Sequence, residues 1–198
     1  MFGLIRVLIG VIFFIIYLLI AKITKLNLKK RHYILSVFAS IVLITVLAFV
    51  PFENLFVTFS SPKAVFNYMN FGKSEIKLIV TGNKTAFVIG GENTNKLLIV
   101  PKTENGWKIG TGYKTQKAYS KITDDLIIDV YQYQNTDDYY IAVYKINGGQ
   151  FDITDSNDSV FYPLGNTSFY TYYAYIPKYN SHYWILVNGE KIVLKTNG

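Results

Sequence analysis

The stretch "LIIDVYQYQNTDDYYIAVYKI", residues 126–146, decides the fold that we expect for this chain. Two runs rich in β-branched and aromatic residues flank the polar residues 135–138, which is the pattern of a β-hairpin. Placing Gln134 opposite Tyr139 fixes the register, because successive side chains of a strand alternate between its two faces. One face then carries only aliphatic side chains: Ile128, Val130, Ile141 and Val143.

The other face of this hairpin is predicted to be aromatic. It carries Asp129, Tyr131, Tyr133, Tyr140, Ala142 and Tyr144, with Tyr133 directly across from Tyr140. A tyrosine offers a large contact area, few rotatable bonds and a polar tip, so this face suits a stacked sugar ring or an extended peptide. Alternatively, both faces are covered within the domain, since aromatic residues also favour strands by fitting them. The tyrosines and Asp129 are therefore candidate ligand-binding residues.

A second aromatic stretch, "SFYTYYAYIPKYNSHYW", occupies residues 168–184. Alternation places Phe169, Thr171, Tyr173 and Tyr175 on one face, and Tyr170, Tyr172, Ala174 and Ile176 on the other. Neither face is polar, which predicts a central strand that is covered on both sides and ends at Pro177. Exposure is expected after it, around Tyr179, Tyr183 and Trp184, and the last two join the candidate ligand-binding residues.

Short strand patterns fill most of the remaining chain after residue 74. They cover residues 75–82, 85–91, 96–102, 106–112, 160–164, 184–187 and 190–194, and residues 113–125 form the longest predicted loop. Asn188-Gly189 predicts a type I′ hairpin turn. One short helix is expected from Pro62, capped by Ser60 or Ser61, with Val65, Phe66 and Met69 on one side; packing on the sheet is favoured over lying on a membrane. About ten strands and one helix predict an antiparallel sandwich or rolled sheet in a domain of residues 53–198.

The first 52 residues have a different pattern and predict a transmembrane helical hairpin. Residues 2–21 are apolar apart from Arg6, and residues 33–52 carry no charge. A helix of about twenty residues reaches about 30 Å, the thickness of the hydrocarbon core. Ser36 and Ser40 form a small-residue face that would let the two helices, or two copies of the chain, approach closely. Small residues are also common in membrane helices, and because the motif is short this simpler interpretation is favoured.

The loop between the spans, residues 22–32, predicts the orientation. It carries Lys22, Lys25, Lys29, Lys30 and Arg31, so the positive-inside rule places it in the cytoplasm, with the N-terminus and the C-terminal domain outside the plasma membrane. The rival interpretation is a cleaved signal peptide. The first apolar stretch is too long for one and lacks a small-residue cleavage site before Lys22, which favours a retained hairpin.

Composition argues against several chemistries. The chain has no cysteine and only two histidines, His32 and His182, so thiol nucleophiles and most metal sites are not expected, and no cofactor is predicted. The net charge of +7 is concentrated in the loop between the spans, so nucleic-acid binding is not expected. The acidic stretch of residues 152–159 lacks calcium-loop spacing, and the neighbouring acids at 124–125 and 137–138 point to opposite sides of an extended backbone.

These patterns favour a non-enzymatic binding or interaction module of the cell envelope, anchored in the bilayer, with an envelope protein, a peptide or a wall glycan as partner. Self-association through the spans is a further expectation. Two other functions stay open. One is an immunity-type membrane protein that protects against a secreted toxin or bacteriocin. The other is a carboxylate-dependent glycan hydrolase, which requires two acidic side chains about 5–10 Å apart in a cleft. Richness in Lys, Asn, Ile and Tyr without Cys is typical of low-GC Gram-positive bacteria.

Overall fold

The computed structural model describes residues 2–24, 29–70, 74–91, 96–146, 149–166 and 169–195. The chain divides into two compact units, Met1–Phe56 and Val57–Gly198, so the division lies four residues beyond the expected end of the hairpin at residue 52. Lys25, one of the residues predicted to set the orientation, lies outside the described residues.

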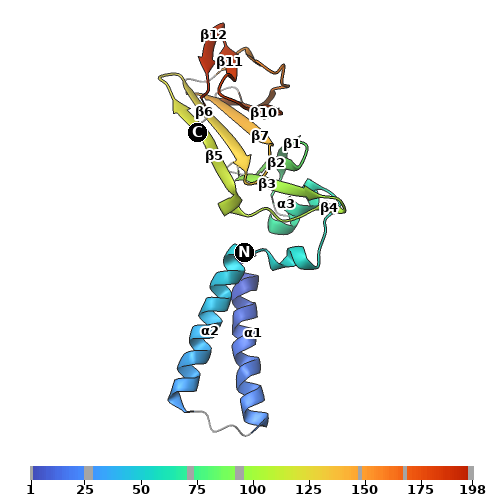
Figure 1. Cartoon of the computed structure of the whole chain (residues 1–198), viewed down its shortest axis with the longest axis vertical. Coiled ribbons are helices and arrows are strands. Elements are labelled where there is room, and N and C mark those ends of the chain that lie inside the picture. Colours follow the sequence, from blue (N-terminus) through green and yellow to red (C-terminus); the bar gives the residue numbers. More distant parts are fainter. Residues whose placement is uncertain are drawn as a thin grey trace. The chain divides into compact units, whose positions relative to one another are not determined.

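The first unit is a pair of antiparallel helices, α1 (Phe2–Ile23) and α2 (Lys30–Phe49), as Figure 1 shows. Small residues lie between them: Ser36 and Ser40 of α2 are buried, and a side chain at Gly10 of α1 would collide with Ile44. Both serine hydroxyls donate to carbonyl oxygens of their own helix, so no polar group is left unpaired there. The predicted small-residue face therefore lies at the contact between the two helices.

α2 begins and ends three residues before the expected span of residues 33–52. It ends because Val50 precedes Pro51 and has an extended conformation (φ −105°, ψ 118°), and the residue before a proline avoids the helical region. A short 3₁₀ helix, η1 (Phe52–Leu55), follows.

Among the described residues, α2 is the one helix long and apolar enough to cross a membrane, with a mean hydropathy of 1.5 over Lys30–Leu47. The described side chains of α1 give a shorter apolar stretch, Leu8–Ile23. The structure therefore gives one candidate span near the N-terminus, by length and composition, and the crossing of the membrane by residues 2–21 stays a prediction.

The second unit is mainly β. In its described residues, twelve strands form three antiparallel sheets. The first sheet has the order β1 (Ile76–Thr81), β2 (Thr85–Gly90), β3 (Lys96–Thr103), β4 (Gly106–Trp107). The second has the order β5 (Thr115–Ile122), β6 (Leu126–Tyr133), β7 (Tyr139–Lys145), β10 (Phe169–Ile176), β9 (Tyr162–Asn166). The third has the order β12 (Glu190–Val193), β11 (Trp184–Val187), β8 (Ile153–Asp155).

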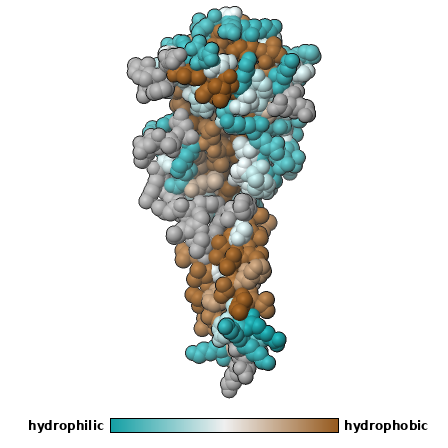
Figure 2. Space-filling view, turned by 90° about the vertical axis from the view of Figure 1, so that its left-hand side faces the viewer, coloured by the Kyte–Doolittle hydropathy of each residue, from teal (hydrophilic) through white to brown (hydrophobic). Residues whose placement is uncertain are grey.

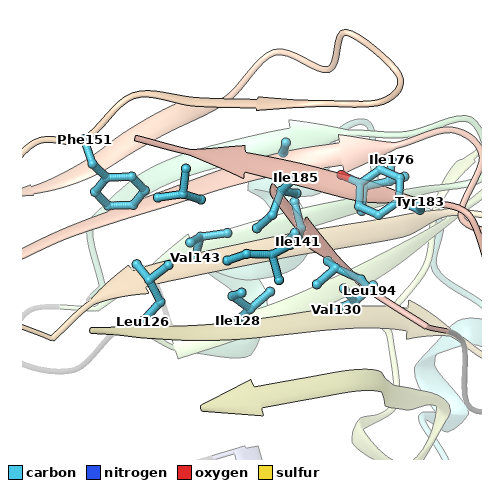
Figure 3. Close-up of a cluster of buried hydrophobic side chains, with 13 residues drawn as sticks. Leu126, Ile128, Val130, Ile141, Val143, Phe151, Ile176, Tyr183, Ile185 and Leu194 are labelled. Atoms are coloured by element: carbon cyan, nitrogen blue, oxygen red, sulfur yellow. The ribbon is translucent and has the colours of Figure 1, made fainter. Parts of the chain in front are cut away.

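The five-stranded sheet is the middle layer, because each of its faces packs against one of the other sheets. Its aliphatic face meets the three-stranded sheet, and Figure 3 shows the resulting cluster, with Ile128, Val143 and Ile141 below Ile185. Its aromatic face meets the four-stranded sheet through Phe87 and Ile99. The expected mainly-β unit with antiparallel sheets is confirmed, and its three sheets pack face to face.

The expected short helix is α3 (Pro62–Asn70). The Ser61 hydroxyl accepts a hydrogen bond from the Ala64 backbone N–H at 3.2 Å, so Ser61 is the capping residue. Val65 and Phe66 are buried, and α3 packs against β1, β2 and β3. Packing on the sheet, rather than lying on a membrane, is confirmed for this helix.

The hairpin of residues 126–146 is confirmed, but its expected register is wrong by two residues. Gln132, not Gln134, pairs with Tyr139, and Tyr131 pairs with Tyr140. The connection is longer because Asn135 has a positive φ of 65° and the Thr136 N–H bonds the Tyr133 carbonyl, so residues 133–138 lie outside the β6–β7 ladder. A shift of two preserves the alternation of side chains, so both faces carry the predicted residues.

Two predicted loops contain strands. Residues 113–125 form η2 (Gly112–Lys114) and then β5, and the acidic stretch contains β8. β5 lies at the edge of its sheet and most of its side chains are exposed, so they are mainly polar. Its sequence therefore lacks the apolar alternation by which a strand is predicted. The Asn188-Gly189 turn is confirmed, since both residues have positive φ (49° and 83°) between the paired Val187 and Glu190.

Candidate functional site

The tyrosine face predicted to bind a ligand is covered by the protein's own first sheet. Phe87 of β2 lies among two of its rings and one ring of β10, with centroid distances of 5.6 Å to Tyr131, 5.2 Å to Tyr140 and 6.0 Å to Tyr173. Tyr131, Tyr133 and Tyr140 are buried, and Tyr144 is half-buried. Phe87 thus occupies the position expected for a ligand, in agreement with the covered alternative.

Asp129, the carboxylate predicted beside this face, is held by three donors. It accepts hydrogen bonds from Lys117 Nζ at 2.8 Å, Ser120 Oγ at 2.7 Å and the Tyr131 hydroxyl at 3.1 Å. Burial alone would raise the pKa of Asp129, but these hydrogen bonds and the Lys117 charge outweigh burial and hold it below its ordinary value. Burial raises the pKa of Tyr131, and Tyr144 and Asp129 raise it further. Asp129 is therefore an ionised carboxylate whose oxygens are hydrogen-bonded within the protein, which is typical of a structural role.

A second buried carboxylate, Asp138, joins two sheets. Only 1% of it is exposed, and it accepts bonds from the backbone N–H groups of Asn83 (3.1 Å) and Lys84 (2.6 Å) in the β1–β2 turn. The hydroxyls of Thr85 and Tyr175 also donate to it, at 2.8 and 3.0 Å. Burial, followed by the hydrogen bond to Asp138, raises the pKa of Tyr175 to about 12. We call Asp138 and these four donors the Asp138 clamp.

The expected exposure around residues 179–184 is wrong for Tyr183. Its ring is buried and its hydroxyl donates to Asp155 at 2.7 Å, because β8 pairs with β11 and places this carboxylate beside it. Burial, followed by the charge of Asp155, raises the pKa of Tyr183. Trp184 is half-buried, with Lys191 Nζ 4.6 Å from its ring centroid, a cation–π contact within the β11–β12 hairpin.

A groove of about 440 Å³ lies beside β1 and Tyr175, which the Asp138 clamp connects through the β1–β2 turn. One wall is β1, through residues 79–81, and the other is the segment that follows β8, residues 157–160. Tyr162, Tyr175 and Pro177 complete the lining. Val160 and Tyr162 are 65% and 42% exposed, so large apolar side chains stand open to solvent at this groove.

The β1 wall presents unpaired backbone groups. Among the described strands β1 pairs with β2 alone, which leaves the second edge of β1 open at Ile79 and Thr81. The Gly82 N–H donates to the Thr85 carbonyl, so Gly82 and Thr85 are a hydrogen-bonded pair of the antiparallel ladder. Hydrogen-bonded and non-hydrogen-bonded pairs alternate along such a ladder, so Val80 and Phe87 are also a hydrogen-bonded pair. Ile79 and Thr81 are then the non-hydrogen-bonded positions, and their N–H and C=O groups point away from β2, toward the groove.

The opposite wall carries polar groups and one charge. Asp158 is exposed and has a positive φ of 53°, and the neighbouring Ser159 hydroxyl is buried without a hydrogen-bond partner in the described structure. Among the described residues lining the groove, Asp158 is the one acidic side chain, so the pair of carboxylates that glycan hydrolysis needs is not assembled there. The described residues also contain no group of three or more His, Asp or Glu suited to a metal ion.

Sequence patterns did not indicate this groove. It combines a backbone edge with a loop some eighty residues further along, and neither carries a motif. Its one local signal is the pair of exposed apolar side chains, Val160 and Tyr162, in a segment whose sequence predicts a strand, while Phe161 between them is half-buried.

Comparison of the chain with known protein families, with curated proteins and with solved structures finds no match in any of the three.

Proposed function

We propose that this chain is a membrane-anchored binding module whose β unit is displayed outside the plasma membrane. The observation that carries the proposal is the contrast between the two units. The β unit places its aliphatic and aromatic side chains between sheets, whereas the helical unit turns them outward.

The outward apolar surface of the helices supports a membrane location. Figure 2 shows the helical part brown along its length, with teal at the end where the chain turns between the helices. Both helices expose large apolar side chains over more than half of their surface: Ile12 and Leu19 in α1, Ile34 and Phe38 in α2. Burying such side chains in lipid is favoured by about 1.5–3 kcal/mol each. We therefore propose that α1 and α2 both cross the bilayer, as a hairpin.

Charge supports the proposed orientation. Lys22, Lys29, Lys30 and Arg31 are exposed at the end of the hairpin where α1 stops and α2 starts. Under the positive-inside rule this end faces the cytoplasm, and the β unit lies outside.

The groove supports a binding role. It offers free backbone donors and acceptors, a carboxylate and exposed apolar side chains, which are features of recognition sites. Phe87 already covers the tyrosine face, so we assign partner binding to the groove instead. Of the residues predicted to bind a ligand, Tyr144 and Trp184 are half-buried and the others are buried.

The absence of cysteine makes the topology directly testable. We would introduce Phe2→Cys, Lys29→Cys or Ile122→Cys singly, the last at an exposed side chain that does not line the groove, and label intact cells with a membrane-impermeant maleimide. We expect labelling at positions 2 and 122, and labelling at position 29 only after permeabilisation. Labelling of position 29 but not position 122 in intact cells would refute the orientation, and protection of position 2 would refute the first span.

A further inference from the structure

We infer that the groove binds an extended peptide as an added strand on the free edge of β1, with a basic side chain of the peptide beside Asp158. This inference rests on the proposed binding function and names the class of partner. It follows from three features of the described residues: an open strand edge, a second wall across the groove of about 440 Å³, and a single negative charge.

The free edge supplies the backbone contacts. Ile79 and Thr81 present N–H and C=O groups to the groove at alternate positions of a six-residue strand. An extended peptide is complementary to such an edge, because its own donors and acceptors repeat with the same spacing. A wall glycan lacks this regular alternation of amide groups, so the edge favours a peptide.

The groove limits how the peptide approaches. Tyr175 and Pro177, at the end of β10, line it, and residues 157–160 form the wall facing β1. The Asp138 clamp holds the β1–β2 turn beside Tyr175, since Asn83, Lys84 and Tyr175 all bond the same carboxylate. The edge is therefore already positioned, which reduces the entropy cost of binding.

Charge selects among peptides. The described lining contains Asp158 and no lysine or arginine, and the remaining polar groups are hydroxyls and amides. An exposed carboxylate attracts a basic side chain modestly, as surface ion pairs do. We therefore expect a preference of about two- to fivefold for a peptide with Lys or Arg over one with Glu at the position facing Asp158.

The test uses the full chain in lipid nanodiscs and a displayed library of random seven-residue peptides, depleted first on empty nanodiscs. Selected peptides are then synthesised with normal amides and with alternate amides N-methylated, which blocks hydrogen bonding at one edge but keeps the side chains. Binding is measured by fluorescence anisotropy to the parent protein and to three variants. Thr81→Pro removes an outward N–H without removing a β1–β2 bond, which a proline on an edge strand tolerates.

Ile122→Pro is the matched control, because residue 122 is an exposed end residue of β5, another edge strand, and does not line the groove. Asp158→Asn removes the charge and suits the left-handed backbone at this position. We expect N-methylation and Thr81→Pro each to weaken binding at least tenfold, Ile122→Pro to leave it unchanged, and Asp158→Asn to abolish the preference for a basic peptide.

Equal binding of normal and N-methylated peptides, or unchanged binding to a folded Thr81→Pro protein, would overturn strand addition, as would a selection that yields no specific peptide. The proposed function fails separately: it fails if the cysteine at position 122, outside the groove, is inaccessible in intact cells, whatever the peptide result.

Discussion

Replacing Asp138 by Asn should destabilise the β unit strongly, although the two side chains have nearly the same shape. The two oxygens of Asp138 accept four hydrogen bonds, two of them from the backbone N–H groups of Asn83 and Lys84, one on each oxygen. An amide turned either way therefore directs its NH₂ group at one of these N–H donors, at a position where the present distance is 2.6 or 3.1 Å.

The magnitude follows from the lost bonds. A hydrogen bond to a charged acceptor contributes about 1.5–3 kcal/mol, and a buried N–H left without an acceptor costs about 1–3 kcal/mol. We expect Asp138→Asn to lower the free energy of unfolding by about 3 kcal/mol. Tyr175→Phe removes one bond of the clamp and should cost about 1.5 kcal/mol, the lower end of that range, because Tyr175 is only half-buried.

The neighbouring residue supplies the control. Asp137 is exposed, so Asp137→Asn should change the free energy of unfolding by less than about 0.5 kcal/mol. Urea unfolding of the full chain in detergent micelles, followed by near-UV circular dichroism, measures all three variants. If Asp138→Asn and Asp137→Asn unfold at the same urea concentration with the same slope, the clamp does not contribute as argued.

Three other properties are also testable. The pKa of Asp129 is lowered in the folded protein, so its contribution to stability is present above the ordinary pKa of about 3.9 and is lost as the pH falls through the lower folded pKa. The stability difference between the parent and Asp129→Asn should therefore shrink on acidification, and urea unfolding midpoints measure it. Gly90→Ala places a methyl group 2.5 Å from Phe66 and should cost about 1–3 kcal/mol by thermal unfolding, whereas Gly112→Ala, with nothing within 4 Å, should be neutral. Burial raises the pKa of Tyr131 and Tyr140, so the stability that their neutral hydroxyls contribute is complete below about pH 10 and is lost as the pH rises toward their pKa in the folded protein. Their tyrosinate absorbance should appear only together with the loss of near-UV circular dichroism.

The sequence predicted what depends on alternation. Both faces of the 126–146 hairpin were predicted correctly despite the wrong register, because an error of two residues does not exchange the faces of a strand. The central position of β10 was also predicted, since neither of its faces is polar, and β10 pairs with both β7 and β9 before it ends at Ile176.

What could not be predicted depends on contacts distant in sequence. Tyr183 was expected to be exposed because the carboxylate that satisfies its hydroxyl, Asp155, lies 28 residues earlier in a strand that the sequence does not reveal. The sequence of β5 predicts a loop, because an exposed edge strand needs no apolar alternation. The groove was missed for a related reason: the polar groups of its β1 wall are main-chain groups, which every residue has.

The sharing of one sheet between two cores has a further consequence. Ile141 and Ala142 are consecutive residues of β7, yet Ile141 belongs to the cluster with the third sheet and Ala142 to the cluster with the first. Neither cluster can lose its middle layer without exposing the other, because the same backbone hydrogen bonds hold both. The β unit should therefore melt in a single cooperative transition, in which damage to either core lowers the stability of the whole unit.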